Sequence, residues 1–325
     1  MGGRSGPSHF ADRLSPHVLF VFLDGVGLGP PHAHNPLADA WPGLERLTGG
    51  RRWTDRTHPF YRPRHVFRHL DATLAVPGLP QSGTGQTALL TGFNAPRIAG
   101  RHYGPYAHSR TRAVLARYNI FRRLKARGLS VAFANAYPPV FFEQARRRDR
   151  WSITTRCCRE ADVRLRTLED LARGEAVAAD LTGRRLHEAG FPVTPIDEAE
   201  AARHLVALLR RYHFVLFEYF LTDQAGHRQD MDESRSVLAS LDRFFSALLE
   251  LLDPERHLLV VTSDHGNLED LRVRAHTRNP VPLIARGRGA ELFRHACDLR
   301  DVTPAIVAAL EAAATPPRQP APLRP

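Results

Sequence analysis

The 325-residue sequence contains little cysteine, little methionine and almost no lysine. Its three cysteines, Cys157, Cys158 and Cys297, have no CxxC spacing and offer no disulfide framework. This cysteine usage favours a reducing cytoplasm. No apolar run approaches the roughly 20 residues that a membrane-spanning helix needs, and the first residues have no signal-peptide core. We therefore expect a cytoplasmic protein that does not associate with a membrane.

Nearly all of the positive charge comes from arginine. The chain has 45 Lys+Arg residues against 34 Asp+Glu, a net charge of +11, and Lys125 is its single lysine. The excess reflects either the base composition of the genome or the attraction of an anionic substrate or nucleic acid. Since no basic stripe with interleaved aromatic residues is present, the sequence argues against nucleic acid as the partner. The oligomeric state is left open.

Apolar segments of strand length alternate with segments of helical periodicity. The sequence predicts strands at 18–23, within 66–76, and at 129–136, 214–220, 258–261 and 281–285. It predicts helices at 82–90, 115–127, 198–211, 234–252 and 301–313. This alternation is typical of an α/β domain with a mostly parallel central sheet.

One Arg-rich segment with weak strand signals interrupts the alternation. We interpret this segment, residues 140–197, as a small insertion or cap, with short helices near 167–179 and 183–189. The expected division is a discontinuous metal-binding core at 1–139 and 198–315, the cap at 140–197, and a disordered proline-rich tail at 316–325. The first 16 residues are expected to be frayed.

Side chains with metal-binding character stand where the expected strands end. They are Asp24, Asp223, His227, Asp264, His265 and His276. In open α/β sheets, ligands bind just beyond the carboxyl ends of the strands. Each of these residues alone has an ordinary explanation as a helix cap or a surface side chain. Their joint placement around one sheet favours a metal site with oxygen and nitrogen donors.

Ser82 opens a helix of small residues and is the candidate nucleophile. The positive end of the helix would favour an anionic phosphate, and Gly83 and Gly85 would let the backbone approach it closely. Alternatively, Ser82 or Thr84 simply caps the helix. No histidine lies nearby in the sequence to act as a base, so activation by a metal is favoured.

Five motifs in this order resemble those of the alkaline phosphatase superfamily, above all the core of cofactor-independent phosphoglycerate mutase and phosphopentomutase. They are V-F-L-D-G-V-G from Val21, S-G-T-G-Q-T-A-L-L-T-G from Ser82, T-D-Q-A-G-H from Thr222, D-H-G-N-L-E from Asp264 and H-T-R-N-P-V-P-L-I from His276. The resemblance implies a three-layer core that binds two divalent ions, Mn²⁺ or Zn²⁺. It assigns one ion to Asp24, Ser82, Asp264 and His265, and the other to Asp223, His227 and His276.

The resemblance implies a phosphatase or phosphomutase that acts on a small phosphate ester through Ser82. A phosphodiester or phosphonate hydrolase is the alternative, and a basic nucleic-acid-binding protein on a degenerate enzyme core is a third possibility. Thr84 and Gln86 depart from the segment that sulfatases modify, and Gln86 stands where the mutases carry histidine. Arg97, Arg101 and His102 are candidate phosphate contacts, or part of a solvated loop.

Overall fold

The structure is a computed structural model that describes residues 16–311, so the expected frayed residues before position 16 and the C-terminal tail lie outside the described range. A seven-stranded sheet forms its centre, in the order β2-β3-β9-β8-β1-β7-β4. The strands are β1 (His17–Leu23), β2 (Phe60–Arg62), β3 (His65–Leu70), β4 (Val131–Phe133), β7 (Phe214–Tyr219), β8 (His257–Thr262) and β9 (Val281–Gly287).

The centre of this sheet is parallel. Strand β1 pairs in parallel with β7 and β8, and β4 pairs in parallel with β7. Strand β9 runs antiparallel to both β8 and β3, and β2 is antiparallel to β3. The side chains of β7 are all buried, as expected for a strand covered on both faces. The predicted α/β fold with a mostly parallel sheet is confirmed.

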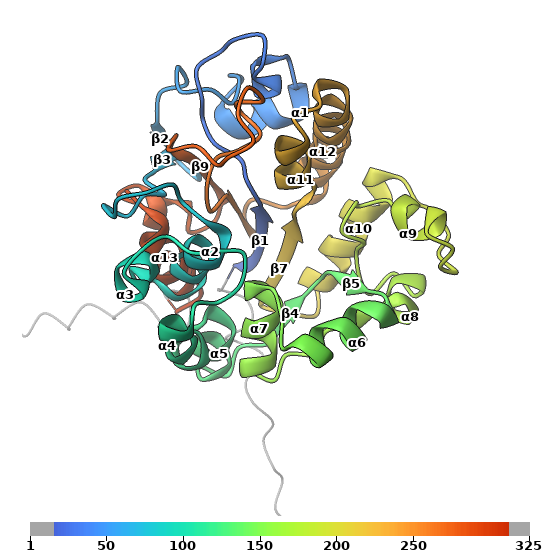
Figure 1. The fold of residues 1–325 in the computed structure, drawn as a ribbon. Helices are drawn as coiled ribbons and strands as arrows, with labels where there is room; N and C mark the ends of the chain where they lie inside the picture. Colours follow the sequence, from blue (N-terminus) through green and yellow to red (C-terminus); the bar gives the residue numbers. More distant parts are fainter. Residues whose placement is uncertain (1–15, 312–325) are drawn as a thin grey trace, which may run out of the picture.

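Helices cover both faces of the sheet and make three layers (Figure 1). Phe20 and Phe22 of β1 join the hydrophobic cluster on one face, and Leu19 and Val21 join the cluster on the other. One layer contains α2 (Ser82–Thr91), α3 (Ala95–Ala99), α4 (Arg112–Tyr118), α5 (Ile120–Lys125), α7 (Ile153–Glu160) and α13 (Val302–Glu311). The opposite layer contains α1 (Pro42–Glu45), α10 (Glu198–Leu209), α11 (Leu221–Arg228) and α12 (Met231–Leu251).

Short 3-10 helices join several of these elements: η2 (Pro36–Ala38), η3 (Arg46–Thr48), η4 (Ser109–Thr111), η5 (Ala290–Phe293) and η6 (Leu299–Asp301). Within residues 16–311, every helix is too short or too polar to cross a membrane.

The segment that was expected to form a cap lies beyond the β4 edge of the sheet (Figure 1). It contains α6 (Pro139–Arg148), β6 (Arg166–Thr167), α8 (Leu168–Ala172) and α9 (Arg184–Glu188), and β6 pairs with β5 (Ala136–Tyr137) in a separate two-stranded sheet. Helix α7, in contrast, packs into the main core through Ile153, Cys157 and Cys158. The role of 140–197 as a cap stays a prediction.

Two predicted elements before this segment are wrong in extent. The single helix expected at 115–127 divides at Asn119, whose side chain accepts a hydrogen bond from the Arg122 amide and donates to the Leu115 carbonyl. Asn119 thereby caps the start of α5 and ends α4. The strand expected at 129–136 is reduced to β4, because Ala136 already belongs to the small sheet.

Two further helices, α6 and α7, were not predicted from the sequence. The pair Pro138-Pro139 predicts a chain break, yet Pro139 is the first residue of α6, where a missing amide hydrogen costs nothing. Helix α7 begins after Ser152, whose hydroxyl accepts a hydrogen bond from the Thr155 amide. The predicted helix at 167–179 is limited to α8, which Thr167 and Asp170 cap.

Candidate metal centre

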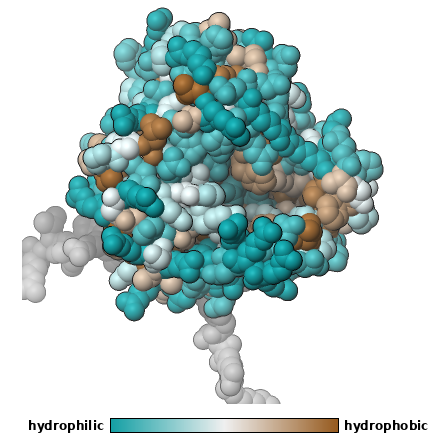
Figure 2. Space-filling view, viewed as in Figure 1, coloured by the Kyte–Doolittle hydropathy of each residue, from teal (hydrophilic) through white to brown (hydrophobic). Residues whose placement is uncertain are grey.

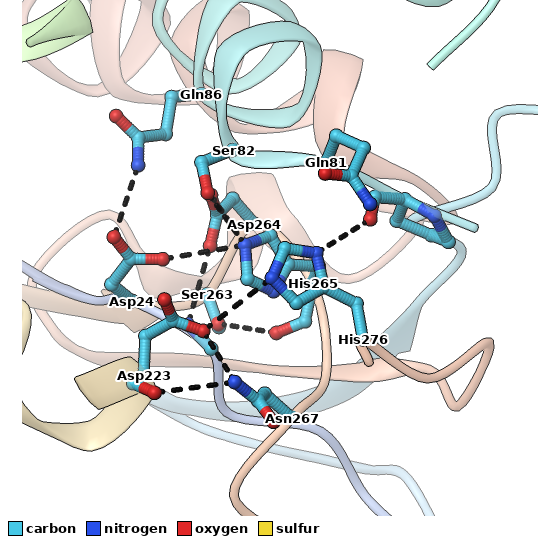
Figure 3. A network of polar contacts seen from close by, with 12 residues as sticks. Asp24, Gln81, Ser82, Gln86, Asp223, Ser263, Asp264, His265, Asn267 and His276 are labelled. Carbon is cyan, nitrogen blue, oxygen red and sulfur yellow. Dashed lines mark hydrogen bonds and ion pairs between the residues drawn. The ribbon is translucent and has the colours of Figure 1, made fainter. Parts of the chain in front are cut away.

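The candidate residues lie at the carboxyl ends of the parallel strands, in the loops that follow them (Figure 3). Asp24 comes directly after β1, and Asp264 and His265 follow β8. Helix α11, directly after β7, carries Asp223 and His227. Ser82 is the first residue of α2, and His276 lies in the loop that leads into β9. The structure therefore brings all seven candidate side chains together at the end of the sheet where the parallel strands have their carboxyl ends.

The first group of donors converges on one nitrogen of His265. Its Nε2 lies 2.9 Å from Ser82 Oγ, 3.4 Å from Asp24 Oδ1 and 3.5 Å from Asp264 Oδ2. All four side chains are buried. A hydroxyl, two carboxylates and an imidazole thus share one small volume.

The second group contains Asp223, His227 and His276. His227 Nε2 lies 3.2 Å from both Asp223 Oδ2 and His276 Nε2, and His276 Nε2 lies 3.7 Å from Asp223 Oδ1. The i, i+4 spacing on α11 places Asp223 and His227 on one face, as the sequence indicated. The rings of His265 and His276 stack with centroids 3.7 Å apart, so the two groups are in direct contact.

The hydrogen bonds of His227 and His276 determine which ring nitrogen of each is available to bind a metal ion. Nδ1 of His227 contacts the Arg274 carbonyl, and Nδ1 of His276 contacts the Pro80 carbonyl, each at 2.8 Å. Each Nδ1 therefore carries a proton, so either ring, when neutral, offers its Nε2 atom as a lone-pair donor. The hydrogen bond with Asp223 raises the pKa of His227. Metal-binding histidines commonly use this arrangement, in which a backbone carbonyl orients the ring.

Burial and crowding shift the pKa values of the carboxyl groups. Burial, and then the neighbouring Asp264, raises the pKa of Asp24 well above its usual range. Burial and Asp223 raise the pKa of Asp264 to about 8. Burial also acts to raise the pKa of Asp223, but contacts with His227, His265 and Asn267 outweigh it and lower that pKa to about 2. Burial and the neighbouring His276 lower the pKa of His265 to about 3.

The donor set fits divalent cations. Asp24 Oδ1 and Asp264 Oδ2 are buried and accept no hydrogen bond from any described residue. Orphaned buried carboxylate oxygens are costly unless a cation or proton compensates them. Mixed carboxylate and imidazole donors suit Zn²⁺ or Mn²⁺. The two groups, Asp24/Asp264/His265 and Asp223/His227/His276, each bring their donor atoms within 4.8 Å of one another.

Glu269 and Asn267 hold the loops that carry these donors. The buried Glu269 carboxylate accepts hydrogen bonds from the amides of Gly27 and Asn267 at 2.9 and 2.8 Å, and from the Asn279 side chain at 3.1 Å. It also accepts one from the Thr277 hydroxyl. Asn267 in turn donates to Asp223 Oδ1 at 2.7 Å. Both residues belong to the D-H-G-N-L-E motif, but their positioning role was not predicted.

Gly25 permits the close approach of two of these loops. Its φ is +70°, and a Cβ atom there would lie 2.5 Å from Asp223 Oδ1. Any side chain at this position would be strained and would also displace Asp223. The Gly25 amide points to Asp264 Oδ1 at 3.4 Å, and the next amide, of Val26, donates to Ser263 Oγ at 2.9 Å. The turn after β1 is therefore fastened to the turn after β8.

Two further polar residues near Ser82 also lacked a predicted role. Gln86, one turn along α2, donates to Asp24 Oδ2 at 3.3 Å. Glu218 lies in the apolar strand β7, where burial raises the pKa of its carboxyl to about 7. A lone carboxylate within F-V-L-F-E-Y is the sequence signal that could have marked it. Its Oε2 accepts a hydrogen bond of 2.5 Å from the Thr154 hydroxyl.

The structure gives no role at the centre to the three weaker phosphate-contact candidates. His102 Nε2 bonds the Val76 carbonyl at 3.1 Å, and the Arg101 guanidinium lies over the Tyr103 ring. Arg97 is exposed near the end of α3. None of the three lines the cavity beside Ser82.

The fold and the donor groups are those of a metal-binding α/β protein, and comparison with known proteins agrees. Residues 192–314 match the model of the Metalloenzyme superfamily. A stretch of 135 residues is 29% identical to the 2,3-bisphosphoglycerate-independent phosphoglycerate mutase of Ehrlichia canis (strain Jake), covering 38% of this chain and 27% of that protein. The chain thus matches well under half of that relative's length.

Solved structures share the fold over nearly the whole chain. The alkaline phosphatase from the Antarctic bacterium TAB5 covers 92% of this chain and 98% of its own, with a TM-score of 0.53 at 11% identity. The alkaline phosphatase of Thermus thermophilus covers 93% of both chains, with a TM-score of 0.54 at 13% identity. The chain thus resembles the Metalloenzyme superfamily over residues 192–314 and shares its fold with alkaline phosphatases.

Replacing Glu269 tests its role as the anchor of the loops. Glu269→Gln puts an amide group where the carboxylate accepts hydrogen bonds, so at least one buried donor loses its partner. We expect the free energy of unfolding to fall by roughly 2–4 kcal/mol, as measured by urea denaturation. Glu291→Gln, a substitution of an exposed glutamate in η5, is the matched control. Equal stability of the two variants would contradict the anchoring role.

Glu218 gives a prediction on pH. Its folded pKa of about 7 lies above the ordinary 4.5, so its stabilising contribution is complete below pH 4.5 and is lost as the pH rises through 7. Glu218→Gln stays neutral and keeps an acceptor for Thr154. The variant should therefore gain stability relative to the parent as the pH rises, by up to about 3 kcal/mol at about 1.4 kcal/mol per pH unit.

Denaturation of the metal-free proteins between about pH 5 and pH 8 measures this difference. Glu188→Gln, at an exposed position in α9, should follow the parent at every pH. A difference between Glu218→Gln and the parent that does not change with pH would rule out a buried, proton-binding Glu218.

Proposed function

We propose that the protein is a two-metal-dependent phosphoryl-transfer enzyme, a phosphatase or phosphomutase, that acts on a small phosphate ester through Ser82. One observation carries the proposal. Ser82 Oγ, at the start of α2, lies 2.9 Å from His265 Nε2, at the point where the carboxylates of Asp24 and Asp264 converge. A nucleophile placed among cation donors is the arrangement that metal-assisted attack on phosphorus requires.

The residues divide into two sets of donors. Asp24, Ser82, Asp264 and His265 would hold one cation, and Asp223, His227 and His276 would hold the other. Bound divalent ions would lower the pKa of the Ser82 hydroxyl and neutralise charge on the phosphoryl oxygens. His265 is a poor general base, because its low pKa leaves it little affinity for the Ser82 proton near neutral pH.

Helix α2 supplies the orientation and part of the electrostatics. Its first turn has the positive end of the helix dipole, which favours both the ionised Ser82 and an anionic phosphoryl group. The Thr87 hydroxyl donates to the Gly83 carbonyl within the helix, and Gln86 faces Asp24. Ser82 is thus held on a rigid element. Its oxygen would attack phosphorus as the ester P–O bond breaks, so that the alcohol leaves and Ser82 carries the phosphoryl group. Transfer to water gives a phosphatase, and return to the substrate gives a mutase.

Substitution of Ser82 and of Thr84 distinguishes the roles of their two hydroxyl groups. Ser82→Ala should abolish turnover of phosphate esters while the fold and most metal affinity remain, because six donors are intact and no other group can form the covalent bond. Thr84 is fully buried, and its hydroxyl bonds the Gln81 carbonyl and the Tyr103 amide. Thr84→Ala should therefore keep substantial activity and lose only about 1 kcal/mol of stability.

The assay is steady-state turnover over a panel of phosphate monoesters, diesters and phosphonates, with mass spectrometry of quenched protein to find phosphate on the Ser82 peptide. Near-normal activity of Ser82→Ala would mean that water, rather than Ser82, attacks phosphorus. Turnover of diesters alone would favour the alternative hydrolase within the superfamily.

Metal binding can be tested without activity. Equilibrium dialysis with Mn²⁺ or Zn²⁺ should show two bound equivalents for the parent, and about one each for Asp264→Asn and Asp223→Asn. Asp270→Asn is the control, because Asp270 pairs with Arg272 outside both donor groups. One equivalent for the parent, or two for both site variants, would refute the two-ion assignment.

A further inference from the structure

A cavity of about 540 Å³ opens beside Ser82 and Asp223. Part of its wall comes from the donor groups, and the remainder is mainly apolar, with Tyr106, Tyr137, Phe141 and Phe220 among its residues. Figure 2 shows this face of the molecule hollowed, with hydrophobic residues gathered in the hollow. The volume lies within the range of small-molecule sites, so a substrate whose phosphate reaches Ser82 has room for its alcohol part here.

The aromatic part of this wall is held in place by ring contacts. Tyr137 and Phe141 stack with centroids 4.0 Å apart, and Trp151 packs its ring edge-on against Phe141 at 6.0 Å. Trp151 is buried, so the platform has support from behind. A flat apolar surface of this kind favours a ring or a branched apolar group over a small hydrophilic one.

The charges in the cavity disfavour a second anionic group on the substrate. Among the described residues that line it, Arg185 is the single cation. Its guanidinium is already bonded to Gln224 and Glu233 at 3.3 and 3.4 Å. The Asp180 carboxylate accepts the amides of Gly183 and Arg185 and adds negative charge. A glycerate carboxylate would therefore find no free cation in the cavity.

Glu218 supplies a polar contact inside this apolar wall. The residue is 4% exposed and lines the cavity. One carboxyl oxygen accepts the Thr154 hydroxyl, and the other accepts no hydrogen bond from any described residue. Because Glu218 lines the cavity, this second oxygen is available to accept a hydrogen bond from a ligand there.

We propose that this cavity binds the alcohol part of a phosphate monoester as an apolar, ring-sized group that carries a hydrogen-bond donor for Glu218 and no second anionic group. The inference rests on the proposed function, because it assumes that the phosphate lies at Ser82. It assigns Phe141 and Glu218 as specificity residues, and it sets this protein apart from the phosphoglycerate mutases to which it is similar.

Binding of non-hydrolysable phosphonates tests the apolar wall independently of turnover. Calorimetry on the manganese-loaded protein should show phenylphosphonate binding at least about tenfold more tightly than methylphosphonate. Phe141→Ala should remove most of this difference while leaving the affinity for methylphosphonate unchanged. Phe141→Leu should retain part of it, and serves as the second variant if the alanine variant does not fold. Phe93→Ala, at an exposed aromatic outside the cavity, should behave like the parent.

The contribution of Glu218 requires a ligand with a donor. An aminomethyl-substituted phenylphosphonate should bind more tightly than phenylphosphonate to the parent protein, and this preference should fall at least about fivefold in Glu218→Gln, since the neutral amide is a weaker acceptor. An unchanged preference in Glu218→Gln would overturn the role of Glu218, and equal binding of phenyl- and methylphosphonate would overturn the apolar site.

Turnover separates this inference from the proposed function. Phenyl phosphate should be hydrolysed with a kcat/KM at least about tenfold above that of phosphoglycerate, and Ser82→Ala should abolish both reactions. Ser82-dependent turnover that favours phosphoglycerate would overturn the inference and leave the proposed function standing. A phenyl preference in binding, without Ser82-dependent turnover of any ester, would support the apolar site and refute the proposed function.

Discussion

The site depends on one buried carboxylate that binds no candidate metal. Glu269 accepts hydrogen bonds from the loop after β1, from the turn after β8 and from the end of the loop that leads into β9. The loop after β1 is far from the other two segments in the sequence, and the three carry Asp24, His265 and His276 respectively. A charged acceptor that satisfies several buried donors fixes geometry more strictly than apolar packing does, because each donor has a defined direction. Asn267 extends the same network to Asp223.

The site also holds several carboxyl groups in a small volume. Three aspartates and three histidines occupy the strand ends. Burial, and then repulsion between the carboxylates, raises the pKa values of Asp24 and Asp264. Folding of the sheet and its two hydrophobic layers supplies the free energy that keeps these side chains together. The loops are therefore held in position despite the repulsion between the carboxylates that they carry. Bound cations would relieve the repulsion, so the folded protein should bind divalent ions favourably.

The sheet and the long helices could be predicted because their signals are local. Val18–Leu23 and Leu258–Val261 are continuous apolar runs, and the small-residue helix from Ser82 has a clear start and end. The motifs also identified the seven residues that now lie together. Helix α6 was not predicted because prolines at a helix start resemble a chain break. Helix α7 was not predicted because it is short and its buried face includes polar residues such as Thr154 and Arg156. The division at Asn119 depends on a side-chain hydrogen bond that periodicity does not reveal.

The positioning residues and the cavity beside Ser82 could not be predicted from the sequence, for a different reason. Glu218 shows only its place in an apolar strand, and its partner Thr154 comes from the distant helix α7. Glu269 bonds Gly27 of the loop after β1 as well as residues of its own loop. Nothing local distinguishes Glu269 from the neighbouring Asp270, which pairs with Arg272 outside the donor groups. The aromatic platform likewise requires Phe141, Tyr137 and Trp151 to meet through tertiary packing.

The loop between β8 and β9 has a closed base. Gly266 and Thr277 pair as an isolated antiparallel bridge, with the Thr277 amide bonded to the Gly266 carbonyl at 2.9 Å. His265 comes immediately before that bridge and His276 is the last residue inside it, while Arg272 and Val273 lie at the exposed tip. The distance between the two histidines is therefore set by the bridge rather than by the length of the loop. Insertions at the tip could diversify the surface of such proteins over evolution without disturbing the spacing of the metal donors.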